Sequence, residues 1–101
     1  MTDMTPHVLL DQLRQRSHFI HGQWVVLDKD VAALYGVTPV QLRRMVKMHI
    51  ARFPSDFLLE VNNQYYFTEA GILMVSCILK NPRADRIIVN IVRELFGFQS
   101  N

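Results

Sequence analysis

One short segment of the chain gathers side chains that can contact nucleic acid. Of the eleven Lys and Arg residues, four lie between Val31 and Ser55 without any acid, and the remainder of the chain carries seven cations against nine acids. Arginine can donate two hydrogen bonds to guanine, glutamine can bond adenine in the same two-pronged way, and threonine or valine can touch a thymine methyl group. The residues of this segment that offer such chemistry are Thr38, Val40, Gln41, Arg43, Arg44, Lys47 and Arg52.

The spacing around these residues is typical of two short helices joined by a turn. Asp28 is expected to cap a first helix whose apolar positions recur every three or four residues. Gly36 is expected to end that helix in a left-handed conformation. Thr38 then caps a second helix with Pro39 at its first position. We predict that this second helix spans residues 38–52 and ends just before the following proline.

This pair matches a helix-turn-helix, in which the first helix supports a second that enters the major groove. Ala32 is small at the position where the two helices would approach most closely. The apolar residues that would fix their angle are Val31, Tyr35, Val37, Leu42 and Met45. The second helix would pack through a stripe formed by Leu42, Met45, Val46, His49, Ile50 and Phe53. Its basic side would then face solvent, where Lys47 and Arg52 could contact DNA phosphates. The alternative that stays open is a basic helix face that contacts only water.

The other elements are predicted to be short and closely spaced. An N-terminal helix is expected within residues 1–17, and "HFIHGQWVVL" predicts a hairpin that turns at Gly22 and Gln23. A second hairpin is expected from "DFLLEV" and "QYYF", separated by Asn62 and Asn63, because asparagine tolerates the positive φ of tight turns. Thr68 is expected to cap the helix "EAGILMVSCIL", whose apolarity all round indicates that it is largely buried.

The last helix, "RADRIIVNIVRELF", has a wide apolar face that belongs either to the core or to a subunit interface. The residues of that face are Ile87, Ile88, Ile91, Val92 and Leu95, with Phe96 and Phe98 near the end. Together these elements predict an α+β fold, mostly helical, with a helix-turn-helix and one or two short β-hairpins. The length of 101 residues predicts a single small domain, with the N-terminal helix followed by a helix-turn-helix domain over residues 18–98.

The remaining reactive side chains are best explained by structural roles. The histidines, at positions 7, 18, 21 and 49, are scattered, and a lone Cys77 within an apolar helix reads as a small buried hydrophobe. Asp28 and Asp30 are explained by capping and by the helix dipole. Without a phosphate loop or a nucleophile motif, we expect no enzyme activity, no cofactor and no metal site.

Apolar runs in this sequence are short. The stretch from Ile72 to Leu79 is far below the length of a membrane span, and the N-terminus "MTDMTPHVLL" lacks the pattern of a secretory signal. No membrane association is expected, and the expected location is the cytoplasm of a bacterial host.

Three blocks of this sequence resemble the KilA-N-like family of phages and prophages, named after the N-terminal domain of a sixth open reading frame. They are "HGQWVVLDKDVAALYGV", "HIARFPSDFLLEV" and "YYFTEAGILMVSCIL" followed by "IIVNIVRELF", and they cover about residues 18–97. The resemblance implies DNA binding in a temperate-phage regulator or antirepressor, with the turn at Gly36 and the helix from Thr38 to Arg52 as the binding element. Two departures from the family pattern are expected: a short connection before "YYFTEAG" and the absence of a C-terminal effector domain.

Three hypotheses follow from these patterns. The first is a sequence-specific regulator that binds double-stranded DNA, expected to act as a homodimer because four cations give one chain few phosphate contacts. The second is a phage-encoded inhibitor or antirepressor that captures a host or phage protein, as the departures from the family and the apolar last helix suggest. The third is a pure dimerisation module.

Overall fold

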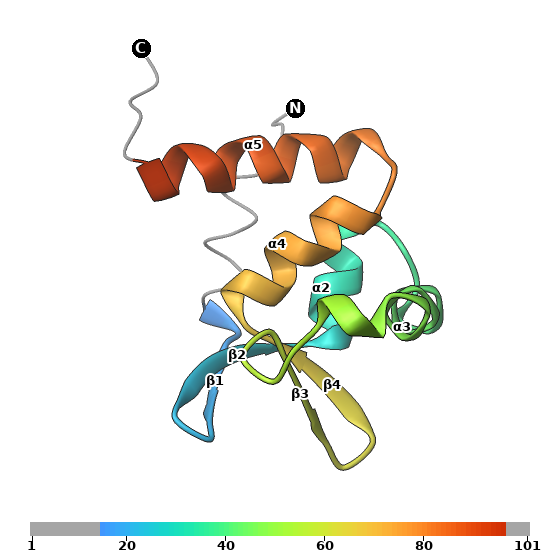
Figure 1. Ribbon diagram of the computed structural model, residues 1–101, viewed down its shortest axis with the longest axis vertical. Coiled ribbons are helices and arrows are strands. Elements are labelled where there is room, and N and C mark those ends of the chain that lie inside the picture. Colours follow the sequence, from blue (N-terminus) through green and yellow to red (C-terminus); the bar gives the residue numbers. More distant parts are fainter. Residues whose placement is uncertain (1–14, 97–101) are drawn as a thin grey trace.

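Four α-helices and a four-stranded antiparallel sheet form the part of the chain that the computed structural model describes, residues 15–96 (Figure 1). In chain order the elements are β1 (His18–Ile20), β2 (Gln23–Leu27), α2 (Asp28–Tyr35), α3 (Pro39–Met48), the 3-10 turn η1 (Ile50–Arg52), β3 (Leu58–Val61), β4 (Gln64–Phe67), α4 (Glu69–Ile78) and α5 (Pro82–Phe96). The predicted α+β class is confirmed. Most of the predicted N-terminal helix lies outside the described residues, and so does Phe98.

The sheet is built from two hairpins that point the same way from the helices (Figure 1). Its strand order is β1-β2-β4-β3, and β2 joins the hairpins by pairing with β4 through Val26 opposite Phe67. The β3–β4 hairpin turns at Asn62 and Asn63, whose φ values of 53° and 65° are positive. The predicted second hairpin is therefore confirmed, because two left-handed residues give a turn that matches the twist of the strands.

The first hairpin turns one residue earlier than expected. Ile20 already pairs with Gln23, so the loop consists of His21 and Gly22, with φ values of 51° and 78°. The predicted turn at Gly22 and Gln23 was wrong. The prediction placed glycine at the first loop position. In the structure two residues with left-handed backbone form the turn, and His21 adopts the first of these two conformations.

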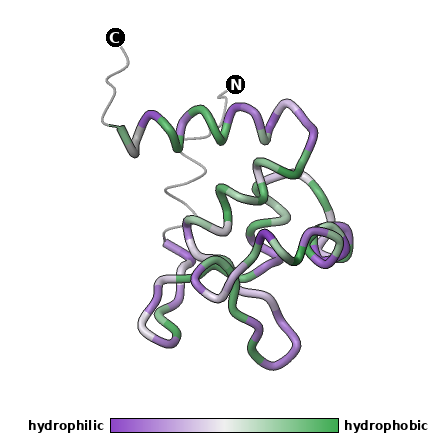
Figure 2. The backbone as a smooth tube through the Cα atoms, in the orientation of Figure 1, coloured by the Kyte–Doolittle hydropathy of each residue, from purple (hydrophilic) through white to green (hydrophobic). Residues whose placement is uncertain are grey.

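The core lies between the sheet and the helices. Helix α4 runs through the middle of it, and Figure 2 shows hydrophobic residues along much of that helix. The largest side chains with almost no exposure are Tyr35, Phe67, Leu42, Ile87, Val25, Val31, Val46 and Val75. Each helix and both central strands contribute to this set, so the packing of any one element depends on the others.

A buried tyrosine ties α2 to α4. The Tyr35 hydroxyl donates to the carbonyl oxygen of Ile72 at 2.9 Å and also makes a short hydrogen bond with the Ser76 hydroxyl. Burial raises the pKa of Tyr35 well above its ordinary value, so the phenol stays neutral and can donate. The contact fixes the position of α2 on the central helix.

Helix α4 begins against the loop that precedes β3. The Thr68 hydroxyl oxygen accepts from the Gly71 backbone N–H at 3.1 Å and donates to the Asp56 carbonyl at 2.8 Å. A Cβ on Gly71 would lie 2.0 Å from the Phe57 carbonyl oxygen. Only glycine therefore permits this close approach of helix and loop. The predicted cap at Thr68 is confirmed.

Two expectations about the C-terminal helices need correction. Cys77 was predicted to be buried but is exposed, because α4 packs through the side that carries Gly71, Ile72 and Val75. The predicted apolar face of α5 is divided: Ile87 and Ile91 are buried. Val92 of that face is exposed, as are Phe96 and also Val89, which the prediction did not include. The helix thus covers the core with one side and presents apolar residues to solvent on another.

Candidate nucleic-acid interface

Helices α2 and α3 are joined by a tight turn at Gly36. Its φ of 71° is left-handed, and the Val37 backbone N–H returns to the Ala32 carbonyl at 3.0 Å. Ala32 is fully buried where the helices meet, as the sequence predicted. A second contact secures this end of α2: Arg83 of α5 points a guanidinium nitrogen at the carbonyls of Ala33 and Leu34, at 3.5 and 3.4 Å. A cation at this position is stabilised by the negative end of the helix dipole of α2.

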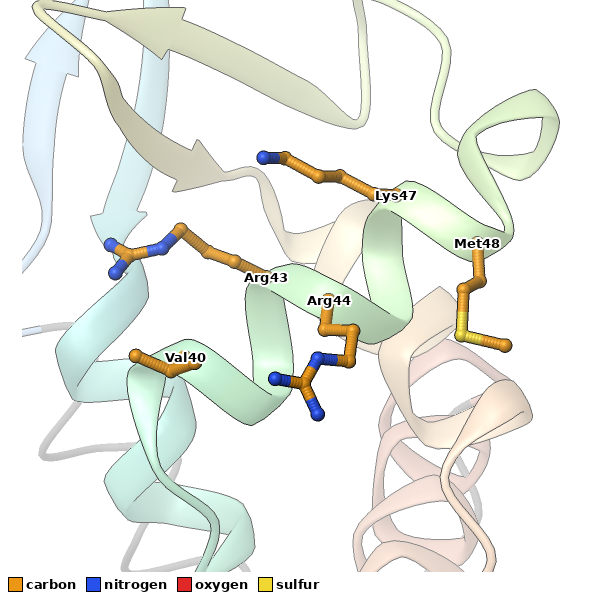
Figure 3. Close-up of a pocket in the computed structure, with 5 residues that line it drawn as sticks. All are labelled: Val40, Arg43, Arg44, Lys47 and Met48. Atoms are coloured by element: carbon orange, nitrogen blue, oxygen red, sulfur yellow. The ribbon is translucent and has the colours of Figure 1, made fainter.

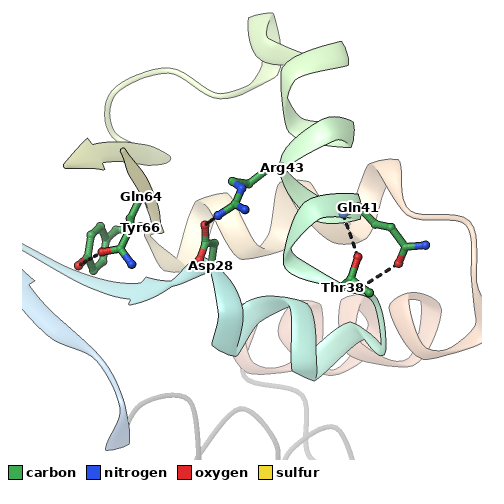
Figure 4. A network of polar contacts seen from close by, with 6 residues as sticks. All are labelled: Asp28, Thr38, Gln41, Arg43, Gln64 and Tyr66. Carbon is green, nitrogen blue, oxygen red and sulfur yellow. Dashed lines mark hydrogen bonds and ion pairs between the residues drawn. The ribbon is translucent and has the colours of Figure 1, made fainter. Parts of the chain in front are cut away.

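The start of α3 is closed by a reciprocal cap (Figure 4). The Thr38 hydroxyl oxygen accepts from the Gln41 backbone N–H at 3.1 Å, and the Gln41 side-chain oxygen accepts from the Thr38 N–H at 2.9 Å. The predicted cap is confirmed. Both residues were also predicted to contact bases, yet the oxygen that Gln41 would offer to adenine is occupied by the cap. Its amide N–H₂ group remains available as a donor, and its oxygen keeps one lone pair.

Helix α3 is shorter than predicted. It ends at Met48, and His49 caps it with φ −123° and ψ 34°, outside the helical region. The His49 ring also hydrogen-bonds the Met45 carbonyl, with its Nδ1 atom 3.0 Å away. The chain continues as the separate turn η1, so the predicted helix over 38–52 was wrong at its end. Consequently Arg52 is exposed on η1 rather than on α3, and Ile50 is exposed rather than packed.

The two sides of α3 differ sharply in chemistry. Leu42 and Val46 are fully buried against the core. On the other side, five residues at spacings of three and four line an open hollow of about 450 Å³: Val40, Arg43, Arg44, Lys47 and Met48. We call these five residues the outer face of α3. Figure 3 shows Arg43 and Lys47 extending to one side of the helix, and Arg44 and Met48 to the other.

Arg43 has an internal partner that sequence reasoning missed. Its guanidinium donates to the Asp28 carboxylate at 3.0 Å, joining the start of α2 to the middle of α3 (Figure 4). Asp28 is only 3% exposed, whereas the Arg43 side chain keeps 36% of its exposure. The prediction that Asp28 caps α2 was wrong: it is the first helical residue, and Leu27 occupies the cap position. Arg43 is thus a structural cation at the edge of the outer face.

The other two cations of the outer face are free of such contacts. Within residues 15–96, neither Arg44 nor Lys47 makes an ion pair, and both are exposed. Arg52 is exposed close by in sequence, on η1. Since no acid stands between Val31 and Ser55, this segment of the chain keeps a net positive charge after Arg43 has been neutralised.

Met48 was not among the predicted site residues, although it is 74% exposed at the end of the outer face. Its spacing of four and eight from Arg44 and Val40 could have revealed it. An exposed thioether beside cations adds an adaptable apolar contact to a charged surface.

No three His, Cys, Asp or Glu side chains of residues 15–96 gather closely enough to hold a metal ion. Across the same range, no helix has both the length and the apolar character that crossing a bilayer requires.

The described residues therefore form a small α+β domain in which the second helix of a tightly turned pair carries exposed cations and no acid. The family profile of the ORF6N domain matches residues 15–65, just over half of the chain's 101 residues. The chain belongs to this phage-associated domain family. The match contains β1 to β3, α2 and α3 and ends at Tyr65, so the sequence blocks within residues 66–97 lie outside it. Neither a curated protein nor a solved structure matches the chain significantly.

Proposed function

We propose that this chain is a regulator of phage or prophage type that binds double-stranded DNA by placing α3 in the major groove. The observation that carries the proposal is the contrast between the two sides of α3. One side is buried through Leu42 and Val46, and the other offers Arg44 and Lys47 to solvent without internal partners in the described residues. A helix presented in this way by a preceding helix is the arrangement with which helix-turn-helix proteins read a groove.

Four residues of the outer face, and Arg52 on η1, have distinct roles in this proposal. Val40 lies near the start of α3 and Arg44 in its middle, and both would contact base edges, Arg44 by donating to guanine and Val40 by touching a thymine methyl. Lys47 and Arg52 would contact phosphates, which give affinity without sequence preference. Arg43, held by Asp28, would use its remaining N–H groups at the edge of the groove.

The small number of exposed cations sets the expected strength of binding. Lys47 and Arg52 neutralise at most two phosphates, so the logarithm of affinity should fall with the logarithm of salt with a slope of roughly −1.8 per chain. A single chain would then bind weakly at physiological salt, and two chains on adjacent half-sites would bind far better. We propose that the protein works in this way in the bacterial cytoplasm, without catalysis and without a cofactor.

The decisive experiment removes the two free cations of α3. The variant Arg44→Ala/Lys47→Ala should lose about tenfold or more in affinity for mixed-sequence duplex DNA, measured by fluorescence anisotropy at about 50 and about 200 mM salt. The slope against salt should become shallower by roughly 0.9 for each phosphate that the variant no longer neutralises.

The matched control removes two exposed cations elsewhere, Lys80→Ala/Arg86→Ala, with the same change in net charge. Control and test variants should melt at the same temperature as the parent chain. Equal loss of affinity in both would mean that net charge alone attracts DNA, and unchanged affinity in the α3 variant would refute the proposal.

A second candidate function is capture of another protein, favoured by one exposed pair. Phe19 and Trp24 lie opposite each other on β1 and β2, with ring centroids 5.1 Å apart, and both are exposed. Exposed aromatic side chains of this kind often dominate protein interfaces. If this candidate is correct, a partner from nuclease-treated bacterial lysate should bind the Arg44→Ala/Lys47→Ala variant and fail to bind Phe19→Ser/Trp24→Ser.

A further inference from the structure

Helix α5 presents apolar side chains on the side that faces away from the core. Ala84, Ile87 and Ile91 are buried and complete the packing against the rest of the domain. Val89 and Val92 nevertheless remain 47% and 38% exposed on the same helix. Because the core does not use them, these valines are available for contact with another surface.

Their spacing is that of a helix-pairing seam. Asp85, Val89, Val92 and Phe96 follow one another at intervals of four, three and four residues, and all four are exposed. Alternating intervals of four and three keep side chains on one line along a helix and allow two helices to pack side by side. We call these four residues the seam of α5.

The charges beside the valines make the seam complementary to itself. Asp85 lies in the first turn of α5 and Arg93 in the last turn, with the valines between them, and both are exposed. When two copies of such a helix run antiparallel, the acid of each meets the arginine of the other. In a parallel pair, by contrast, each Asp85 would face its own copy at close range, which is unfavourable.

We infer that α5 pairs antiparallel with α5 of a second copy of this chain. Val89 of each copy packs against Val92 of the other, and Asp85 approaches Arg93 of the second copy. The pairing is isologous, because both copies use the same surface. In Figure 1 α5 crosses the end of the molecule away from both hairpins, so the pairing leaves the hairpins uncovered.

This inference does not rest on DNA binding, because the seam lies on α5 and shares no residue with the outer face of α3. A single helix pair is smaller than the roughly 1,600 Å² of a standard interface. The dimer is therefore expected to be weak, and its population should rise with protein concentration.

The first test measures the mass of the full chain by sedimentation equilibrium over a wide concentration range, without DNA. The parent chain should pass from monomer to dimer, and Val89→Asp/Val92→Asp should stay monomeric at the highest concentration. The matched control is Val40→Asp/Ile50→Asp, which makes the same change at two exposed apolar residues outside α5 and should dimerise like the parent. A parent chain that is monomeric throughout would overturn the inference.

The second test reverses the charges and does not depend on apolar residues. Asp85→Arg alone and Arg93→Asp alone should each weaken dimerisation by about tenfold or more, because each places like charges opposite one another. The double variant restores opposite charges and should recover the dimer. A folding defect could not produce that recovery, and a double variant as weak as the two single ones would contradict antiparallel pairing.

Discussion

The helix pairs α2–α3 and α4–α5 both pack through fully buried apolar residues, and α2–α3 is joined by an ion pair as well. The α2–α3 pair is tied by the Asp28–Arg43 ion pair at one end, and by the cap of Thr38 at the turn. The α4–α5 pair contributes fully buried apolar side chains such as Val75 and Ile87, and at its turn the Asn81 side-chain oxygen accepts from the Ala84 backbone N–H at 2.7 Å. Polar contacts have narrow geometric requirements, whereas apolar contacts contribute free energy with little direction.

Because of this difference, the orientation of α3 and the stability of the whole domain depend on different contacts. The ion pair, together with the buried Ala32 and Leu42, sets the angle at which α3 leaves the body, and α3 carries the exposed Arg44 and Lys47. The contacts of α4–α5 supply much of the buried apolar area on which the free energy of folding depends. Substitutions in the two regions should therefore differ in kind as well as in size.

The largest loss of stability is expected where α4 packs against the loop that precedes β3. Gly71→Ala places a methyl group where 2.0 Å separates it from the Phe57 carbonyl oxygen, so helix and loop must move apart. We expect a loss of more than about 3 kcal/mol in the free energy of unfolding, measured by urea denaturation. Gly22→Ala is the control, because nothing lies within 4 Å of its Cβ and only its left-handed φ of 78° opposes the change, for about 1–2 kcal/mol. Equal losses at the two glycines would contradict this account.

A smaller effect is expected from the ion pair that orients α3. Arg43→Ala leaves the buried Asp28 carboxylate without its cation and should cost about 1–3 kcal/mol, less than for a fully buried pair because Arg43 is one third exposed. Arg44→Ala, one residue away, should change stability by less than about 0.5 kcal/mol. Adding Asp28→Asn to Arg43→Ala should recover part of the loss. Equal stability of the two alanine variants would show that the ion pair does not hold the helices.

The smallest effect is expected at the polar contact that joins the two helix pairs. Tyr35→Phe removes the hydroxyl that donates to the Ile72 carbonyl and contacts Ser76, at a cost of about 1 kcal/mol in urea denaturation at neutral pH. The matched control is Tyr66→Phe, whose hydroxyl makes only an exposed 3.4 Å bond to Gln64. If Tyr66→Phe lost as much stability as Tyr35→Phe, the buried hydroxyl of Tyr35 would have no special role in stability.

The same tyrosine should also make stability depend on alkaline pH. Burial raises the pKa of Tyr35 above its ordinary value of 10.0, so above that pH the unfolded chain loses a proton that the folded chain keeps. Stability from this group is complete below pH 10 and declines above it, by up to about 1.4 kcal/mol per pH unit. Tyr35→Phe should flatten the decline without removing it, because burial, with Glu60 nearby, also raises the pKa of Tyr65.

Local patterns in the sequence predicted the elements well. The turn at Gly36, the caps of Thr38 and Thr68 and the turn at Asn62 and Asn63 each depend on residues within a few positions of one another. Their chemistry could therefore be deduced without knowing the rest of the fold. The apolar stripe through Leu42 and Val46 was correct for the same reason.

Features that depend on distant residues could not be predicted in this way. The partner of Arg43 lies 15 positions earlier, and only the crossing angle of α2 and α3 brings Asp28 to it. Cys77 is exposed because the surrounding elements cover only one side of α4. Within the candidate site, the exposure expected of Arg44 and Lys47 was thus correct, whereas the freedom of Arg43 and the placement of Arg52 on α3 were wrong.

The outer strands of the sheet have a further consequence. The edges are β1, of three residues, and β3, of four. Edges as short as these give an incoming strand few backbone groups to pair with, which protects a small protein against fibrous aggregation. Such protection would allow the chain to accumulate in a crowded cell without its molecules adding to one another's sheets.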